Sequence, residues 1–252
     1  MKQLFYLLVI SFLISCNPNP EKKDLIGVWS ITHENIQGDL IFTQDSAFAK
    51  GLTNLGLSYT WKINDSTIYY KYHGDSIPGY NRNWQLNYRF NPKKDSLYIT
   101  QPWDSSHFES PFIRIHNGYE HFMHQSRSKI DLPKKNDSLV FLEDSDFGLN
   151  IYVSYRDEKT KAQIEQAKSN LNEFSAYNYS FMDRISKEEE SKVKIILFID
   201  RNVPEKKEDS IKRIIRKGNH YKHKIFRIYT NKTVDYKKYR WNDTIRWYGI
   251  YE

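Results

Sequence analysis

The sequence predicts two folded domains behind an exported N-terminal segment: an all-β small antiparallel barrel, then an α+β domain whose sheet carries two helices on one face. In the first half, short runs of alternating apolar and polar residues are separated by turn residues about every eight to twelve positions. In the second half, apolar residues at helical spacing follow strand-like runs. Aromatic residues make up 15% of the chain, which favours β-structure.

The N-terminus has the order of parts of a signal peptide. Lys2 is followed by an apolar run at residues 4–14 and then by Ser15 and Cys16. A membrane-spanning helix needs about 20 apolar residues, and the polar residues 17–23 do not extend this run. We therefore predict that residues 1–15 are removed and that residues 16–24 form a tether.

The segment Leu13-Ile14-Ser15-Cys16 resembles the lipobox of bacterial lipoproteins. The resemblance implies that residues 1–15 are a lipoprotein signal peptide and that Cys16 becomes the lipid-bearing first residue, anchored in a membrane of the cell envelope. Cys16 is the only cysteine, so it has no disulfide partner in the chain. In the best-known sorting rule an aspartate after the lipidated cysteine retains the protein in the inner membrane. Asn17 stands there instead, which implies the outer membrane. The alternative is an ordinary signal peptide with an unrelated cysteine.

Charge divides the exported part in two. Residues 25–133 carry ten basic and ten acidic side chains, whereas residues 134–252 carry 25 basic and 19 acidic ones. The Pro-Lys-Lys-Asn-Asp stretch between these compositions is typical of a domain boundary. We predict a barrel domain at 25–132, a linker at 133–138 and an α+β domain at 139–252.

The first domain contains eight candidate strands with one buried face each. They are 26–32, 39–43, 47–50, 58–63, 67–72, 84–90, 96–101 and 111–115. The short breaks at Asn64-Asp65 and Lys94-Asp95 predict hairpins. A closed or nearly closed up-and-down barrel would remove the exposed edges of these strands.

Two segments of this domain resemble lipocalin-like proteins. Leu25-Ile26-Gly27-Val28-Trp29 resembles the glycine-x-tryptophan opening of lipocalin-like domains, and Tyr59-Thr60-Trp61-Lys62-Ile63 resembles a central strand of lipocalin-like lipoproteins. On physical grounds we expect Trp29 to close one end of the barrel and Gly27 to permit a kink beneath it.

A barrel of this size is either filled by its own side chains or holds one small ligand. The candidate cavity residues are Trp29, Trp61, Tyr69, Trp84 and Tyr98. Their strand spacing favours core packing over a cavity. The sequence therefore leaves a small apolar ligand as an alternative and does not identify it.

The second domain is predicted from strands and helices in alternation. Strands are expected at 139–142, 149–155, 193–199 and 224–230, with a closing hairpin of 237–241 and 244–251. One helix is expected where Ile164, Ala167, Leu171 and Phe174 recur, and a second from Pro204 to Gly218-Asn219 with Ile211, Ile214 and Ile215 as its apolar stripe.

Residues 193–230 of this domain resemble the periplasmic domain of ExbD/TolR-type biopolymer-transport proteins. The similarity rests on Phe198-Ile199-Asp200-Arg201-Asn202-Val203-Pro204 before a helix and Phe226-Arg227-Ile228-Tyr229-Thr230 after it. It implies a partner-binding or dimerising module, with Asp200 as a helix-entry residue. The chain lacks the family's membrane helix with a buried carboxylate, so energy transduction is not implied.

A basic interval is the candidate partner surface. Residues 206–240 contain thirteen Lys or Arg against three acids, and we single out Lys212, Arg213, Arg216, Lys217 and Lys224. Such a surface can hold an acidic envelope protein, acidic lipid head groups or another polyanion, and nucleic acid is not expected in the envelope. A solvated lysine-rich face is an equal alternative.

Motifs for catalysis are missing from the sequence. We find no Gly-x-Ser-x-Gly elbow, no phosphate-binding loop and no His-Glu-x-x-His helix. Two groups of histidines lie close in sequence: His116, His121 and His124, and His220 with His223. We expect these to be surface or hydrogen-bonded histidines rather than metal ligands. We therefore predict a protein that is not an enzyme, with no cofactor and no metal.

Three functions remain from the sequence. The leading hypothesis is a lipid-anchored envelope protein that acts as a partner-binding adaptor or assembly factor. The second is a lipocalin-like carrier of a small apolar ligand. The third is an immunity-type inhibitor lipoprotein, for which nothing in the chain identifies a target.

Overall fold

The computed structural model describes residues 20–32, 38–50, 57–72, 83–101, 109–143, 147–165 and 170–252. The chain separates into two compact units, Met1–His116 and Asn117–Glu252. The predicted signal peptide and Cys16 lie outside the described residues. Among the helices in the described ranges, none has both the length and the apolar composition needed to cross a membrane.

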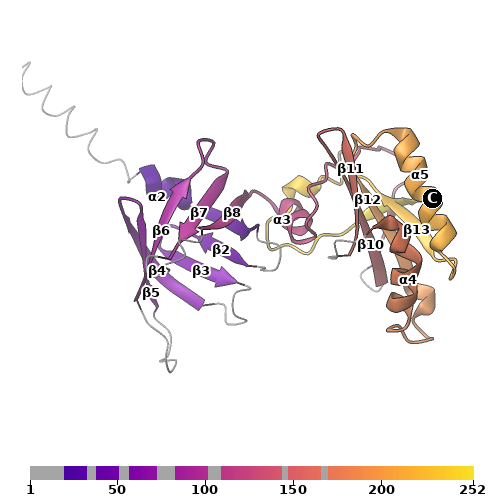
Figure 1. The fold of residues 1–252 in the computed structure, drawn as a ribbon, viewed down its shortest axis with the longest axis horizontal. Coiled ribbons are helices and arrows are strands. Elements are labelled where there is room, and N and C mark those ends of the chain that lie inside the picture. The colour runs from indigo at the N-terminus through magenta and orange to yellow at the C-terminus, as the bar shows by residue number, and fades with distance from the viewer. Residues whose placement is uncertain are drawn as a thin grey trace, which may run out of the picture. The chain divides into compact units, whose positions relative to one another are not determined.

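The first unit is a closed antiparallel barrel of eight strands, as predicted (Figure 1). Each strand pairs with the next along the chain, and β8 returns to pair with β1. The strands are β1 (Gly27–Ile31), β2 (Asp39–Phe42), β3 (Ser46–Lys50), β4 (Leu57–Asn64), β5 (Thr67–Tyr72), β6 (Asn83–Phe90), β7 (Ser96–Thr100) and β8 (Glu109–Ile115). The predicted hairpins at Asp65 and Lys94 are present, and both residues have the positive φ that tight hairpins require.

A short helix, α2 (Pro20–Leu25), precedes β1 and supplies Leu25 to the barrel core. The indole Nε1 of Trp29 donates a hydrogen bond to the Leu25 carbonyl at 2.8 Å, and the Trp29 side chain is fully buried. The guanidinium of Arg114 lies 4.8 Å from the centre of the Trp29 ring and donates to the Ile26 carbonyl. Gly27 bends the chain here with φ 141°, a conformation that residues with a Cβ rarely adopt.

The second unit is built on a six-stranded mixed sheet, so its class is α+β. The strands are β9 (Val140–Phe141), β10 (Phe147–Arg156), β11 (Lys159–Ile164), β12 (Val193–Ile199), β13 (Lys224–Ile228) and β14 (Tyr248–Tyr251). Their order is β11-β10-β12-β13-β14-β9. The central strands β10, β12 and β13 are parallel, and the outer pairs are antiparallel.

Two helices cover one face of this sheet. The helices α4 (Phe174–Met182) and α5 (Glu205–Gly218) lie on the same side of the sheet (Figure 1). They share a core with Ile195, Leu197 and Ile199 of β12. The intervening Ile196 and Phe198 point to the opposite face, which a third helix, α3 (Gly118–Gln125), helps to cover. The sequence did not predict α3.

The helix predicted through Ile164, Ala167, Leu171 and Phe174 is wrong. Ile164 ends strand β11, Leu171 lies in the 3-10 turn η1 (Leu171–Glu173), and α4 begins only at Phe174. Ala167 lies outside the described residues. The three described side chains belong to one core, although they reach it from different elements. Their spacing therefore arises because all three side chains pack in the same core, and not because they belong to one helix.

The predicted terminal hairpin is also wrong. Residues 236–238 form a 3-10 turn, η3 (Tyr236–Lys238), and β14 pairs with β13 and β9 instead. The Tyr236 and Trp247 rings lie 4.7 Å apart over the face that α3 covers. Packing of these large rings against the sheet replaces a local hairpin.

The division between the units precedes the predicted linker. Tyr119, Met123 and Leu132 pack in the core of the second unit, and the Tyr119 ring stacks on Tyr236 at 5.8 Å. The residues predicted as linker pair with the end of β13, because Thr230 donates to the Pro133 carbonyl and Lys135 donates to the Thr230 carbonyl. The charge change at residue 133 therefore lies within the second unit.

Candidate functional sites

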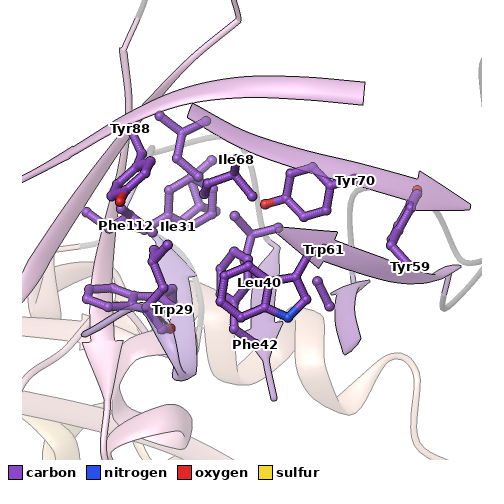
Figure 2. Close-up of a cluster of buried hydrophobic side chains, with 14 residues drawn as sticks. Trp29, Ile31, Leu40, Phe42, Tyr59, Trp61, Ile68, Tyr70, Tyr88 and Phe112 are labelled. Atoms are coloured by element: carbon purple, nitrogen blue, oxygen red, sulfur yellow. Dashed lines mark hydrogen bonds between the residues drawn. The ribbon is translucent and has the colours of Figure 1, made fainter. Parts of the chain in front are cut away.

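The interior of the barrel is occupied by its own side chains (Figure 2). The Phe42 and Trp61 rings lie 4.9 Å apart, and the Tyr59 and Tyr70 rings lie 5.7 Å apart. The buried cluster comprises Leu25, Trp29, Ile31, Leu40, Phe42, Ala47, Tyr59, Trp61, Ile68, Tyr70, Tyr88, Leu97, Ile99 and Phe112. These contacts are those of a packed core.

The structure separates the five candidate cavity residues into two groups. Trp29 and Trp61 are buried in the interior, and Trp84 is half-buried against the same cluster. Tyr69 and Tyr98 do not belong to that cluster. Each lies between two inward-facing residues of its strand, and successive strand side chains point to opposite faces. These two tyrosines therefore do not line the interior.

A surface depression of about 480 Å³ lies over β4, β5 and β6. It is lined by Thr60, Trp61, Lys62, Tyr69, Tyr70, Lys71, Asn83 and Trp84. Five of these side chains alternate with inward-facing residues along their strands and therefore point to the outer face: Thr60, Lys62, Tyr69, Lys71 and Asn83. The depression is thus mainly a feature of the barrel's outer wall.

Among the described residues of the barrel unit, two buried side-chain atoms have no hydrogen-bond partner, the Tyr70 hydroxyl and Arg114 Nε. The hydroxyl of Tyr70 is buried, points in among the core side chains (Figure 2), and has no hydrogen-bond partner within the described ranges. Burial raises the pKa of Tyr70 far above its ordinary value, and neighbouring Tyr59 raises it further. An unsatisfied buried hydroxyl costs about 1–3 kcal/mol. This hydroxyl can donate a hydrogen bond to an acceptor that enters the barrel.

Lys212, one of the five predicted surface cations, is largely buried in an ion-pair network. Its Nζ lies 2.8 Å from a Glu208 carboxylate oxygen and 2.7 Å from a Glu252 carboxylate oxygen. Burial lowers the pKa of Lys212, but its hydrogen bonds to both carboxylates outweigh this and raise the pKa above the ordinary value. Arg227 pairs with the same Glu208. Lys212 therefore ties α5 to the end of the chain and does not face a partner.

The other four candidate cations are exposed: Arg213, Arg216, Lys217 and Lys224. No ion pair of any of these four is present among the residues that the structure describes. The first three lie on the last two turns of α5. Their charges are available to an acidic partner, and those in the last turn also stabilise the helix C-terminus.

The sequence reasoning missed an exposed aromatic group beside these cations. Tyr179 of α4 is 47% exposed and Tyr221 of the turn after α5 is 39% exposed. The ring of His220 stacks on Tyr179, and the ring of His223 stacks on Tyr221. The available signal was the sequence His220-Tyr221-Lys222-His223 directly after the predicted helix stop.

Asp200 has a structural position at the end of β12. It is fully buried, and its carboxylate accepts hydrogen bonds from the backbone N–H groups of Asp131 at 3.0 Å and Asn202 at 2.9 Å. The carboxylate thus holds the turn that leads into α5. In the described part of the chain, no group of three or more His, Cys, Asp or Glu side chains is arranged to hold a metal ion.

Comparison of the chain with protein-family models, curated proteins and solved structures found no match.

Proposed function

We propose that this protein is a lipid-anchored, non-enzymatic adaptor or assembly factor of the cell envelope, which binds a protein partner through its second unit. The observation that carries the proposal is the distribution of surface chemistry. The barrel interior is packed, whereas the exposed cations Arg213, Arg216 and Lys217 and the exposed aromatic residues Tyr179 and Tyr221 all lie in the second unit.

The proposed anchor is the lipidated Cys16 in the outer membrane. Helix α2 begins at Pro20, and a fully extended chain spans at most about 3.6 Å per residue, so about 14 Å separates the anchor from the barrel unit at most. A short tether of this kind would hold the barrel near the membrane. We further propose that the barrel is lipocalin-like, on the basis of its Gly27-x-Trp29 opening and its closed sequential strand order.

Labelled fatty acid tests the anchor. The chain produced in its own host should incorporate the label, and the Cys16→Ser variant should not. Label that persists in the variant would disprove lipidation at Cys16.

The partner is tested by crosslinking in the same host followed by native mass spectrometry. We expect a specific partner protein on the wild-type chain, lost when Arg213, Arg216 and Lys217 are changed to glutamate. The control reverses the same number of charges by changing the exposed cations Arg156 of β10 and Lys159 and Lys161 of β11 to glutamate, and it should retain the partner. Equal loss in both variants would show that net charge alone is responsible, and the adaptor surface would be wrong.

A second candidate function is carriage of a small apolar ligand, which the unpartnered Tyr70 hydroxyl favours. A ligand with one hydrogen-bond acceptor would satisfy that hydroxyl while its apolar part contacts the aromatic core. Native mass spectrometry of gently purified protein would then show a bound mass of a few hundred daltons, reduced in the Tyr70→Phe variant. Unliganded wild-type protein from its own envelope would count against this function.

A further inference from the structure

The depression on the outer wall of the barrel lies between two rows of outward-facing side chains. One row crosses β4, β5 and β6 at Thr60, Lys71 and Asn83, which are paired in register. The other crosses β4 and β5 at Lys62 and Tyr69. Residues two apart in a strand lie about 6.6 Å apart along it, so the rows are separated by about that length. The two rows therefore form the sides of the depression.

The floor of the depression is the backbone of the sheet. Trp61, Tyr70 and Trp84 also line it, and they pair with one another across the three strands. Their side chains pack in or against the barrel core, so the atoms that they present to the outer wall belong to the backbone. The strand ladder and the packed interior fix this floor. A ligand would therefore not have to order the site when it binds.

The charge of this wall has one sign. The strands β4, β5 and β6 contain no Asp or Glu, and they carry three cations, Lys62, Lys71 and Arg89. Arg89 is paired with Glu109 of β8. Lys62 and Lys71 are exposed, and neither has an ion pair among the residues that the structure describes. Both lysine charges are therefore available to an anion in the depression.

The acids nearest to these lysines along the chain do not cancel their charge. Asp65 lies in the turn that joins β4 to β5, beyond the paired ends of both strands. The segment 73–82 between β5 and β6, which lies outside the described residues, holds one acid and one cation, Asp75 and Arg82. Residues 25–133 as a whole carry ten basic and ten acidic side chains. The positive wall is thus a local feature of a balanced unit.

The remaining groups of the depression suit a ligand rich in hydroxyl groups. The Thr60 hydroxyl and the Asn83 amide can each donate and accept hydrogen bonds. The half-buried Tyr69 ring offers a negative face to the positively polarised C–H groups of a sugar ring. The Lys62 ammonium lies 5.8 Å from the centre of the Tyr69 ring. The depression therefore presents a cation, an aromatic ring and uncharged polar groups together.

A protein partner or an acyl chain fits this depression less well. In the described ranges, all five exposed large hydrophobic side chains belong to the second unit. The barrel wall thus lacks the exposed apolar anchors that dominate protein interfaces. Its volume of about 480 Å³ lies in the range of about 300–1,000 Å³ that is usual for small-molecule sites. These features favour a small polar anion.

We propose that the depression over β4, β5 and β6 binds an acidic saccharide, with Lys62 and Lys71 contacting its carboxylate or phosphate group and the Tyr69 ring contacting the face of a sugar ring. Thr60 and Asn83 contact its hydroxyl groups. The site does not rest on the proposed adaptor function, which uses the second unit, or on the carriage of an apolar ligand inside the barrel.

Isothermal titration calorimetry tests the ligand class on the chain from residue 16, produced without the signal peptide and with Cys16→Ser. The acidic probes are trigalacturonate, which carries carboxylates, and glucose 6-phosphate. The neutral probe is maltotriose, and the acidic probes without sugar are triglutamate and inorganic phosphate. At least one acidic sugar should bind about tenfold or more tightly than maltotriose and the sugar-free anions, because it makes both charge-assisted and ring contacts. The tighter of the two acidic sugars identifies the acid group.

Substitutions in the depression test the residues. The double variant Lys62→Gln and Lys71→Gln should weaken binding of the acidic sugar by about tenfold. The matched control removes the same charge from two other exposed lysines of the barrel unit, Lys23→Gln and Lys93→Gln, and should bind as the wild type does. Far-ultraviolet circular dichroism of each variant separates lost binding from lost folding.

The aromatic contact has its own pair of variants. Tyr69→Ala should weaken binding several-fold, whereas Tyr69→Phe keeps the ring and should retain it. The control is Tyr98→Ala, because Tyr98 also points outward but lies on β7, outside the depression. It should leave binding unchanged.

Three results would overturn the proposal. The first is a folded chain that binds neither acidic sugar at low millimolar concentration. The second is binding of triglutamate, inorganic phosphate or maltotriose as tight as that of the acidic sugars, which would show that charge alone or sugar alone is recognised. The third is an equal loss of binding in the Lys62/Lys71 variant and in its Lys23/Lys93 control.

Discussion

The two units differ in where they place their aromatic side chains. In the barrel, rings such as Trp29, Phe42 and Trp61 are buried, whereas all five exposed large hydrophobic residues in the described ranges belong to the second unit. A closed barrel pairs every strand on both sides and has one interior, so its large apolar side chains are buried in that interior. An open sheet has two faces and two edges, and its covering elements leave apolar surface at their ends. The difference supports the proposal that the second unit, and not the barrel, carries the recognition surface for a protein partner.

The strongest test of a packed barrel is Trp29→Ala. Trp29 is fully buried beneath Arg114 and against Leu25, so we expect a loss of about 3–5 kcal/mol in the free energy of unfolding. Urea denaturation measures it. Trp84→Ala, at a half-buried position, should cost clearly less. Equal costs would mean that the interior around Trp84 is packed as tightly as the interior around Trp29.

The ion-pair network of the second unit should respond strongly to the loss of one charge. Glu208→Gln leaves Arg227 without its partner in a site where both side chains are less than 15% exposed, and we expect a loss of about 3 kcal/mol. Glu205→Gln, an exposed acid in the first turn of α5, should change stability by less than about 0.5 kcal/mol. A small effect at Glu208 would show that water reaches the network.

Buried tyrosine hydroxyls should behave oppositely in the two units. The Tyr119 hydroxyl donates to the Ile130 carbonyl at 2.7 Å, so Tyr119→Phe should destabilise the second unit by about 1–2 kcal/mol. The Tyr70 hydroxyl has no such partner, so Tyr70→Phe should be neutral or stabilise the barrel by up to about 1 kcal/mol. Thermal unfolding measures both. Clear destabilisation by Tyr70→Phe would reveal a bound water or ligand on that hydroxyl.

The smallest expected difference is in alkaline stability. Burial raises the pKa of Tyr70 above its ordinary value of 10.0, so the folded barrel favours the protonated phenol. The stability from this group is fully present below pH 10 and is lost as the pH rises further, because the unfolded chain ionises first. Tyr70→Phe should therefore reduce the slope of stability against pH above 10. An unchanged slope would show that Tyr70 does not titrate with unfolding.

The barrel was predictable strand by strand because its pairing is local. Each strand pairs with its neighbour along the chain, and the turns at Asp65 and Lys94 sit between alternating runs. The interior residues were only partly predictable. In the sequence, Tyr69 and Tyr98 are aromatic strand residues like Trp61. Each directly follows an inward-facing residue, Ile68 or Leu97, so its side chain points to the outside of the barrel. Because aromatic residues occur on both faces of these strands, the sequence does not show which of them point inward.

In the second unit, the sequence by itself determined the elements with strong local signals, β12 and α5. An unbroken apolar run and a proline-initiated amphipathic stripe are sufficient for these elements. Only the tertiary structure decided that Ile164 and Phe174 share a core from different elements, that Lys212 is neutralised by Glu252, and that Tyr179 meets Tyr221. Each of these depends on contacts between residues far apart in the chain. Local periodicity does not predict such contacts. It indicates on which face of its own element a residue lies, but not which other element packs against that face.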